Sequence, residues 1–406
     1  MFDPESIRKD FPLLSREVYG RPLVYLDSGA TAQKPACVTE TIVRLHETMN
    51  ANVHRGVHRL SSEMTEAYEG ARERVRRFIG AAEREEVIFT SGATAAINMV
   101  AAAWGNKYIG AGDNVVVSEM EHHSNLVPWQ QIALQRGAGL RVIPFDDEGR
   151  LETERLGELI DERTRIVAVT QASNTLGTRP DLRVVIDAAH AAGAKVLVDG
   201  CQGIVHGGVD VQALGCDFYA FSGHKIFGPT GTGVLYGRRE VLEQMPPYMF
   251  GGDMVDTVSF AGTTFAPLPL RFEAGTSNFV GAVALGEALK YVEERMPADE
   301  VAHYEEELLK YASERLLQID GLRIYGTTAG KCPIISFNVE GVHPYDMGMI
   351  LDKAGIAVRT GHHCAEPVMT HYGVTGMCRA SLAPYNTAAE ADALVAGVGR
   401  AVRMLR

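Results

Sequence analysis

The sequence predicts an α/β protein with a mostly parallel sheet, and two observations carry that prediction. Between residues 24 and 236, short runs rich in β-branched residues alternate with longer helical patterns, which is the order that a parallel sheet requires. From residue 246 to 269 this alternation gives way to Gly, Pro and aromatic residues, and mixed helices and strands follow. We therefore expect a large α/β domain followed by a smaller α+β domain.

Seven runs have the length and composition of buried strands. They cover residues 87–90, 114–118, 140–145, 165–170, 195–199, 218–222 and 233–236. Between them the helical pattern is clearest around Met64, Tyr68, Val75 and Ile79, which share one apolar face at helical spacing. The stretch 246–269 is expected to form a long functional loop.

The remaining elements belong to the end of the chain. Helices are expected at residues 282–295, 299–318, 345–354 and 388–404, and strands at 334–339 and 357–359. We expect a large domain over residues 23–290 and a small α+β domain over residues 291–406. Residues 1–22 are expected to form an N-terminal segment that packs with the small domain.

Composition excludes several classes of protein. The 39 basic and 51 acidic residues give a net charge of −12, so binding to nucleic acid would need a local basic patch. The clearest basic cluster, Arg72, Arg74, Arg76 and Arg77, is interspersed with glutamates and is interpreted as a solvated helix face. No run approaches the roughly 18 apolar residues of a membrane helix, and residues 1–11 lack a secretory signal. A cytoplasmic protein with neither nucleic-acid nor membrane partners is expected.

The six cysteines contain no C-x-x-C pair, so neither a metal site nor a disulfide framework is expected. In a reducing compartment they are thiols. Cys364 ends the motif R-T-G-H-H-C at residues 359–364, where a guanidinium and two imidazoles would lower the pKa of the thiol. The other five lack such neighbours and are interpreted as structural.

Lys225 follows a predicted strand and lies in S-G-H-K, residues 222–225, among small and apolar residues. Most lysines are solvated surface charges, but desolvation disfavours the ammonium, and a neutral amine can trap an aldehyde. This is the linkage that pyridoxal phosphate (PLP) enzymes use. A PLP site also needs an acid for the ring nitrogen, a phosphate cradle and a group that stacks on the ring.

Candidates for these parts follow other predicted strands. Asp199 ends one strand, Thr94 lies in the turn before a helix, where anions bind, and His122 follows a third strand and could stack on a ring. Each residue alone could instead be a helix cap or a structural side chain. The functional interpretation is favoured because the carboxyl ends of parallel strands meet at one crevice.

Two arginines, Arg359 and Arg379, could bind a substrate carboxylate bidentately, and Asn174 could donate to the same group. Ordinary ion pairs with other acidic residues are the alternative.

Together these features resemble the SufS-type (group II) cysteine desulfurases and selenocysteine lyases, in the class V aminotransferase family of fold-type I PLP enzymes. The resemblance extends over nearly the whole chain. It is carried by L-D-S-G-A-T at residues 26–31, V-H-R-G-V-H at 53–58, M-E-H-H at 120–123, V-D-G at 198–200, S-G-H-K at 222–225, R-T-G-H-H-C at 359–364 and M-C-R-A-S at 377–381.

The resemblance implies a role for each candidate. Lys225 would carry PLP, Asp199 would contact its ring nitrogen, Gln202 its phenolic oxygen, and His122 would stack on its face. Phosphate contacts are implied for Ala93, Thr94, Ser222 and His224, with Thr276 reaching the phosphate of the neighbouring subunit of a homodimer. Substrate contacts are implied for Arg379, Asn174, Arg359 and His54.

The implied reaction starts from L-cysteine. Lys225 would remove the Cα proton and the Cys364 thiolate would attack the substrate sulfur, giving L-alanine and a persulfide on Cys364; L-selenocysteine would also be accepted. Relatives pass the sulfur to a SufE or SufU acceptor for iron–sulfur cluster assembly by the SUF system. His343 resembles the histidine with which some relatives bind the zinc of a SufU-like acceptor. The alternative interpretation is that His343 is only a turn residue before Pro344.

Two departures and two rival functions complete the interpretation. Ala95 stands where close relatives have a glutamate, and Cys201 replaces the usual Ala of V-D-G-A-Q, which would place a second, non-catalytic thiol near the cofactor. A transaminase or kynureninase-like lyase would need Lys225 but not Cys364. A non-catalytic sulfur-assembly scaffold that keeps PLP for stability would not need Lys225, Asp199, His122 and Cys364 together.

Overall fold

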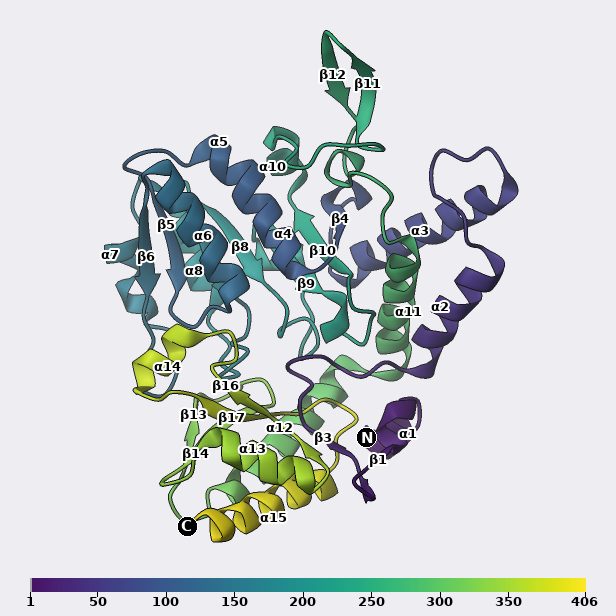
Figure 1. Cartoon of the computed structure of the whole chain (residues 1–406). Helices are drawn as coiled ribbons and strands as arrows, with labels where there is room; N and C mark the ends of the chain where they lie inside the picture. Colours follow the sequence, from purple (N-terminus) through teal and green to yellow (C-terminus); the bar gives the residue numbers. More distant parts are fainter. Residues whose placement is uncertain (1) are drawn as a thin grey trace.

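The computed structural model describes residues 2–406, and a seven-stranded sheet forms the centre of the larger domain (Figure 1). Its spatial order is β4 (Val87–Thr90), β10 (Gly233–Gly237), β9 (Phe218–Ser222), β8 (Lys195–Asp199), β7 (Thr164–Thr170), β5 (Asn114–Ser118) and β6 (Gly139–Ile143). β10 is antiparallel to both of its neighbours, and the other neighbouring pairs are parallel. The seven predicted strands and the mostly parallel sheet are confirmed.

The central strands are rich in apolar residues and mostly buried because helices cover both faces of the sheet. In β5 every residue is buried. Val115 and Val117 pack in the cluster formed with α4 (Ala93–Val100) and α6 (His123–Arg136), whereas Val116 packs in the cluster on the opposite face, with α8 (Leu182–Ala191). This alternation follows from the two-residue period of a strand.

The layer beyond β4 is formed by α2 (Ala36–Thr48), α3 (Arg59–Phe78) and α11 (Phe279–Arg295), and α11 packs on both of the others. The predicted apolar stripe is the buried face of α3. The prediction of a solvated basic face is wrong for Arg72, which is fully buried and donates two hydrogen bonds, of 2.7 and 2.9 Å, to the Glu273 carboxylate. Arg72 directly follows the buried Ala71 on the stripe, and its charge is neutralised by a residue 201 positions away.

The smaller domain contains a second, antiparallel sheet with the order β13 (Leu322–Tyr325), β14 (Ile334–Val339), β17 (Met377–Ser381) and β16 (Arg359–Gly361). Helices α12 (Ala298–Leu316), α13 (Pro344–Lys353) and α15 (Ala388–Leu405) cover it, and α14 (Glu366–Tyr372) lies beside it (Figure 1). The predicted helices agree with these to within a few residues. This architecture, a large α/β domain with a separate smaller domain, is that of the fold-type I class expected from the sequence.

The predicted strand at residues 357–359 is divided in two. β15 (Ile356–Ala357) pairs in parallel with β3 (Val24–Tyr25), and Arg359 begins β16. The N-terminal segment also contacts the smaller domain through an ion pair of 2.9 Å between Arg8 and Glu390. The domain boundaries at residues 22 and 290 remain predictions.

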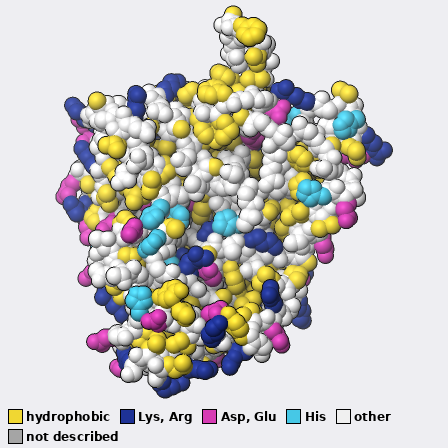
Figure 2. Space-filling model, in the orientation of Figure 1, with side chains coloured by type: hydrophobic (Ala, Val, Ile, Leu, Met, Phe, Trp, Pro, Cys, Tyr) yellow, Lys and Arg dark blue, Asp and Glu magenta, His cyan; other side chains and the backbone are white. Residues whose placement is uncertain are grey.

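The stretch 246–269, expected as a loop, contains a β-hairpin of β11 (Val255–Ser259) and β12 (Gly262–Phe265), which projects from the body of the molecule (Figure 1). Val, Thr and Phe are good strand formers, and a two-residue connection at Phe260 and Ala261 joins the strands. Phe260 and Val258 are exposed, and Figure 2 shows apolar side chains on this projection. Over residues 2–406, none of the helices combines the length and apolarity needed to cross a membrane.

Candidate active site

A cavity of about 340 Å³ opens at the carboxyl ends of the parallel strands, between the two domains. It is lined by all of the residues proposed from the sequence except Thr276 and His54: Ala93, Thr94, His122, Asn174, Asp199, Gln202, Ser222, His224, Lys225, Arg359, Cys364 and Arg379. These residues come from positions 93 to 379 of the chain. The parallel sheet brings the first nine to one edge, and the smaller domain adds the last two arginines and the thiol.

Lys225 ends the single turn that follows β9. Its Nζ donates a hydrogen bond to the carbonyl oxygen of Gly29, and the next two residues, Ile226 and Phe227, are buried. Burial lowers the pKa of Lys225 to about 8, and the charge of Arg379 acts in the same direction. At pH 7 about a tenth of the amine is therefore neutral, far more than for an ordinary lysine, and the neutral form is the one that captures an aldehyde.

Asp199 ends β8 and is buried, with its Oδ1 accepting a hydrogen bond of 3.0 Å from the Cys201 amide. His122 caps the N-terminus of α6, where its Nδ1 accepts a hydrogen bond of 3.1 Å from the Ser124 amide. Burial lowers the pKa of His122, so its imidazole is neutral at pH 7. The cavity thus presents one carboxylate and one neutral ring beside the lysine.

The N-terminus of α4 forms another wall. Ala93 donates its amide to the Ser222 hydroxyl at 2.9 Å, which ties this turn to the end of β9. Gly233 permits that contact, because a Cβ at residue 233 would lie 2.4 Å from the Cα of Gly92. Burial, with the charge of Lys225, lowers the pKa of His224 to about 4. The wall offers hydroxyl, amide and imidazole groups suited to a phosphate.

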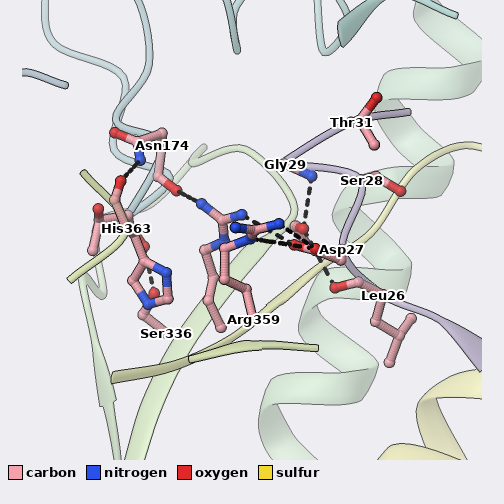
Figure 3. Close-up of polar contacts among 12 residues, drawn as sticks. Leu26, Asp27, Ser28, Gly29, Thr31, Asn174, Ser336, Arg359 and His363 are labelled. Carbon is pink, nitrogen blue, oxygen red and sulfur yellow. Dashed lines mark hydrogen bonds and ion pairs between the residues drawn. The ribbon is translucent and has the colours of Figure 1, made fainter. Parts of the chain in front are cut away.

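Two arginines of the smaller domain close the cavity on the side away from α4. Arg359 on β16 lies directly opposite Arg379 on β17. Arg379 is 2% exposed and donates a hydrogen bond of 2.8 Å to the carbonyl oxygen of Asn174. The Asn174 amide donates in turn to the carbonyl oxygen of His363 at 2.7 Å (Figure 3).

Cys364 is exposed at the mouth of the cavity. His363 and Cys364 have φ of 52° and 56°, a left-handed conformation that side chains disfavour. The loop is held there because the Cys364 carbonyl oxygen accepts a hydrogen bond of 2.7 Å from the His123 amide, and the His123 ring accepts another, of 3.2 Å, from the Glu366 amide. The thiol is therefore open both to the cavity and to another molecule outside it.

The other cysteines differ from Cys364. Cys216, Cys332 and Cys378 are buried, and burial raises the pKa of each thiol. Cys201 lines the cavity, as its position next to Asp199 suggested, and burial raises its pKa well above the ordinary value. A thiol held in its protonated form is a poor nucleophile.

Thr276 and His54 lie outside the cavity. Thr276 is exposed, and the Nε2 of His54 lies 3.0 Å from the Glu69 carboxylate. Their roles stay predictions, since Thr276 is expected to act on a neighbouring subunit. Sequence reasoning assigned no role to Asp27, Gly29 or Thr170, although L-D-S-G-A-T was recognised as a motif. Gly29 and Thr170 line the cavity, and Asp27 lies behind its arginines.

A lysine of lowered pKa, a buried carboxylate and a helix N-terminus around one cavity at the strand ends of an α/β sheet define the site of a PLP-dependent enzyme. The volume and the donor set fit that cofactor: Lys225 for the aldehyde, Asp199 for the ring nitrogen and the α4 wall for the phosphate. Comparison with known proteins agrees. The family described as "Aminotransferase class-V" matches residues 24–394, and the chain belongs to this family of PLP-dependent enzymes.

Relatives of known activity and structure are similar over the full length. The chain is 52% identical to a cysteine desulfurase of Klebsiella pneumoniae and 51% identical to one of Salmonella typhi, covering 100% of this chain and 99% of each relative. Among solved structures, the cysteine desulfurase CsdA of Escherichia coli, in its S-sulfonic acid form, has a TM-score of 0.93 and 42% identity, with 100% of both chains covered. The apo cysteine desulfurase of Thermococcus onnurineus has a TM-score of 0.94 and 38% identity, covering 100% of this chain and 99% of that one.

The lowered pKa of Lys225 predicts the pH dependence of cofactor capture. Below a pKa of about 8 the neutral fraction of the amine rises about tenfold per pH unit, and above it the fraction levels off. The rate at which the cofactor-free protein captures PLP, followed by absorbance, should therefore level off above about pH 8. Free Nα-acetyl-lysine is the control, with a rate that rises to about pH 10. A protein rate that follows this control would contradict the lowered pKa.

Proposed function

We propose that this enzyme is a cysteine desulfurase, which converts L-cysteine to L-alanine and leaves the sulfur as a persulfide on Cys364. The observation that carries the proposal is the exposed Cys364 thiol at the mouth of the cavity that holds Lys225. An amino-transferring or lyase reaction would use the lysine but would have no role for that thiol. The full-length similarity to cysteine desulfurases supports the same reaction.

Each residue that lines the cavity has a proposed role in the reaction. Arg379 and Arg359 present two guanidiniums to the substrate carboxylate, a geometry that favours bidentate binding. The neutral amine of Lys225 serves as the base for the Cα proton, and bound PLP supplies the electron sink for the charge that this proton leaves behind. Asp199 would keep the ring nitrogen protonated, and the neutral ring of His122 would stack on the cofactor and accept or return a proton.

The sulfur step balances without an outside oxidant. The Cys364 thiolate attacks the substrate sulfur, a sulfur–sulfur bond forms, and the substrate bond between Cβ and sulfur breaks. The electron pair of that bond stays with the carbon, which takes a proton to become the methyl group of alanine. Cys364 then carries the sulfur outside the cavity, where the exposed loop allows an acceptor to reach it.

The test is product analysis with the PLP-loaded enzyme, L-cysteine and a reductant that clears the persulfide. A desulfurase forms L-alanine and sulfide in equal amounts. A transaminase forms the 2-oxo acid of cysteine when an amino acceptor is supplied, and a scaffold forms neither product. Formation of the 2-oxo acid, or the absence of L-alanine, overturns the proposal.

We further propose that the persulfide is passed to a SufE or SufU type of acceptor for iron–sulfur cluster assembly by the SUF system, and that L-selenocysteine is a second substrate. A reducing compartment such as the cytoplasm suits an enzyme whose six cysteines are all free. A homodimer is supported by the exposed apolar side chains of Phe260 and Val258 on the hairpin, together with the exposed Thr276. Sedimentation velocity at micromolar concentration distinguishes a dimer from a monomer.

The acceptor proposal makes a prediction at His343. This residue is exposed and caps α13, because its Nδ1 accepts a hydrogen bond of 3.3 Å from the Tyr345 amide. His343→Asn keeps a good capping oxygen but removes the zinc-binding imidazole. If the acceptor is of the SufU type, this variant should lose acceptor-stimulated alanine formation while basal turnover stays within about twofold. A SufE acceptor should be unaffected. Equal stimulation by SufU in variant and parent would remove His343 from the acceptor site.

A further inference from the structure

Asp27 joins the two arginines of the cavity, and Figure 3 shows its contact with Arg359. Arg359 donates to its carboxylate through Nη2 at 2.9 Å and Nε at 3.1 Å, and Arg379 donates through Nη2 at 3.3 Å. Asp27 is not among the residues that line the cavity, whereas both arginines are. The carboxylate therefore lies behind the guanidiniums and acts on the cavity through them.

The backbone fixes this arrangement. Like charges directly opposite each other on antiparallel strands repel, and Arg359 is paired with Arg379 in register. Asp27 forms a parallel β-bridge with Ser381, two residues beyond Arg379 on β17 and so on the same face of the sheet. The strand pairing places a carboxylate beside two cations that would otherwise separate.

Arg359, Arg379 and Asp27 together carry a net positive charge. Two guanidiniums and one carboxylate sum to +1, which matches the single negative charge of an amino acid carboxylate. Arg379 is 2% exposed, and over residues 2–406 its buried Nε has no hydrogen-bond partner. Buried donors of this kind are costly when unpaired, so the cluster retains binding capacity for one anion.

The turn at residues 27–29 also contacts Lys225 on the other side of the cavity. The carbonyl oxygen of Gly29, two residues after Asp27, accepts hydrogen bonds from Lys225 Nζ and, at 2.8 Å, from Gln202 Nε2. Residues 27–29 thus set the separation between the reactive amine and the two arginines. This separation matters for a substrate that carries its amino and carboxylate groups on one carbon.

We propose that Asp27 is a positioning residue that holds Arg359 and Arg379 for the α-carboxylate and so makes the enzyme selective for α-amino acids over simple amines. The inference rests on the proposed function in one respect, the assignment of the two arginines to the substrate carboxylate. It assigns no sulfur chemistry to Asp27.

The test compares Asp27→Asn with the parent holoenzyme, using two ligands that differ only in the carboxylate. L-alanine carries it and ethylamine lacks it, and binding of each is followed by the change in absorbance of bound PLP. Asp27→Asn should weaken the binding of L-alanine at least about tenfold, because Arg359 loses its partner and turns to solvent. The affinity for ethylamine should change by less than about twofold. Asp27→Glu keeps the negative charge on a longer side chain, and its affinity for L-alanine should lie between those of the parent and Asp27→Asn. Asp187→Asn, which breaks the exposed pair with Arg183 (3.1 Å) on α8, is the matched control and should change neither.

Each other outcome overturns the inference. Equal weakening of both ligands would mean that Asp27 only supports the turn at Gly29. Unchanged or tighter binding of L-alanine would mean that the carboxylate competes with the substrate. If Asp27→Asn does not fold, Asp27→Glu carries the test, because selective weakening of L-alanine is still expected. The readout needs no desulfuration, so a failed alanine assay with L-cysteine would remove the proposed function and leave this result readable.

Discussion

A Lys225→Ala variant is expected to lose the absorbance of covalently held PLP and to lose turnover by about 10³-fold or more, as removal of a positioned base does. Among residues 2–406, Lys225 is the one lysine that lines the cavity. Burial also lowers its pKa to about 8, so the variant removes both the attachment point and the base. Reduction with borohydride followed by peptide mass analysis should place PLP on Lys225 in the parent and on no peptide in the variant.

Lys34 is the matched control for this experiment. Burial, together with the charge of Lys225, lowers its pKa to about 8 as well, but it lies outside the cavity lining and its Nζ donates to the Thr31 hydroxyl at 3.2 Å. Lys34→Ala should therefore keep the PLP absorbance. If the absorbance survives Lys225→Ala and is lost in Lys34→Ala, the assignment of the reactive lysine is wrong.

The second large effect is expected for Cys364→Ala, which should keep the PLP absorbance and lose about 10³-fold or more of L-alanine formation from L-cysteine. The thiol is the proposed sulfur nucleophile, and its side chain forms no hydrogen bond with Lys225 or Asp199. Its side chain is exposed and its φ of 56° suits alanine no worse than cysteine, so the melting temperature should not change. Mass spectrometry after one turnover without reductant should find no added sulfur on the protein.

Cys201→Ala provides the control inside the same cavity. It removes a thiol whose pKa burial raises and replaces it with a side chain of similar size, so persulfide on Cys364 and alanine formation should both persist. Full activity in Cys364→Ala, or loss of activity in Cys201→Ala alone, would move the nucleophile to Cys201 or to the substrate itself.

The prediction of the fold succeeded where the pattern is local. The strand of residues 114–118 contains three consecutive valines and the α3 stripe repeats at helical spacing, so composition and period alone identify them. The hairpin at 255–265 was missed because its side chains are mostly exposed and leave no burial pattern. Arg72 was misplaced because its partner, Glu273, lies 201 residues away.

The sequence by itself determined the seven strands and identified Lys225 and Cys364 as the proposed reactive residues, because a strand and the residues that directly follow it are neighbours in the chain. Only the tertiary structure decided the electrostatics of the site. The lowered pKa of Lys225 arises from burial among distant segments, and Asp27 reaches Arg359 and Arg379 across 332 and 352 residues. Desolvation and charge pairing depend on what surrounds a group in space, and that environment exists only once the chain has folded.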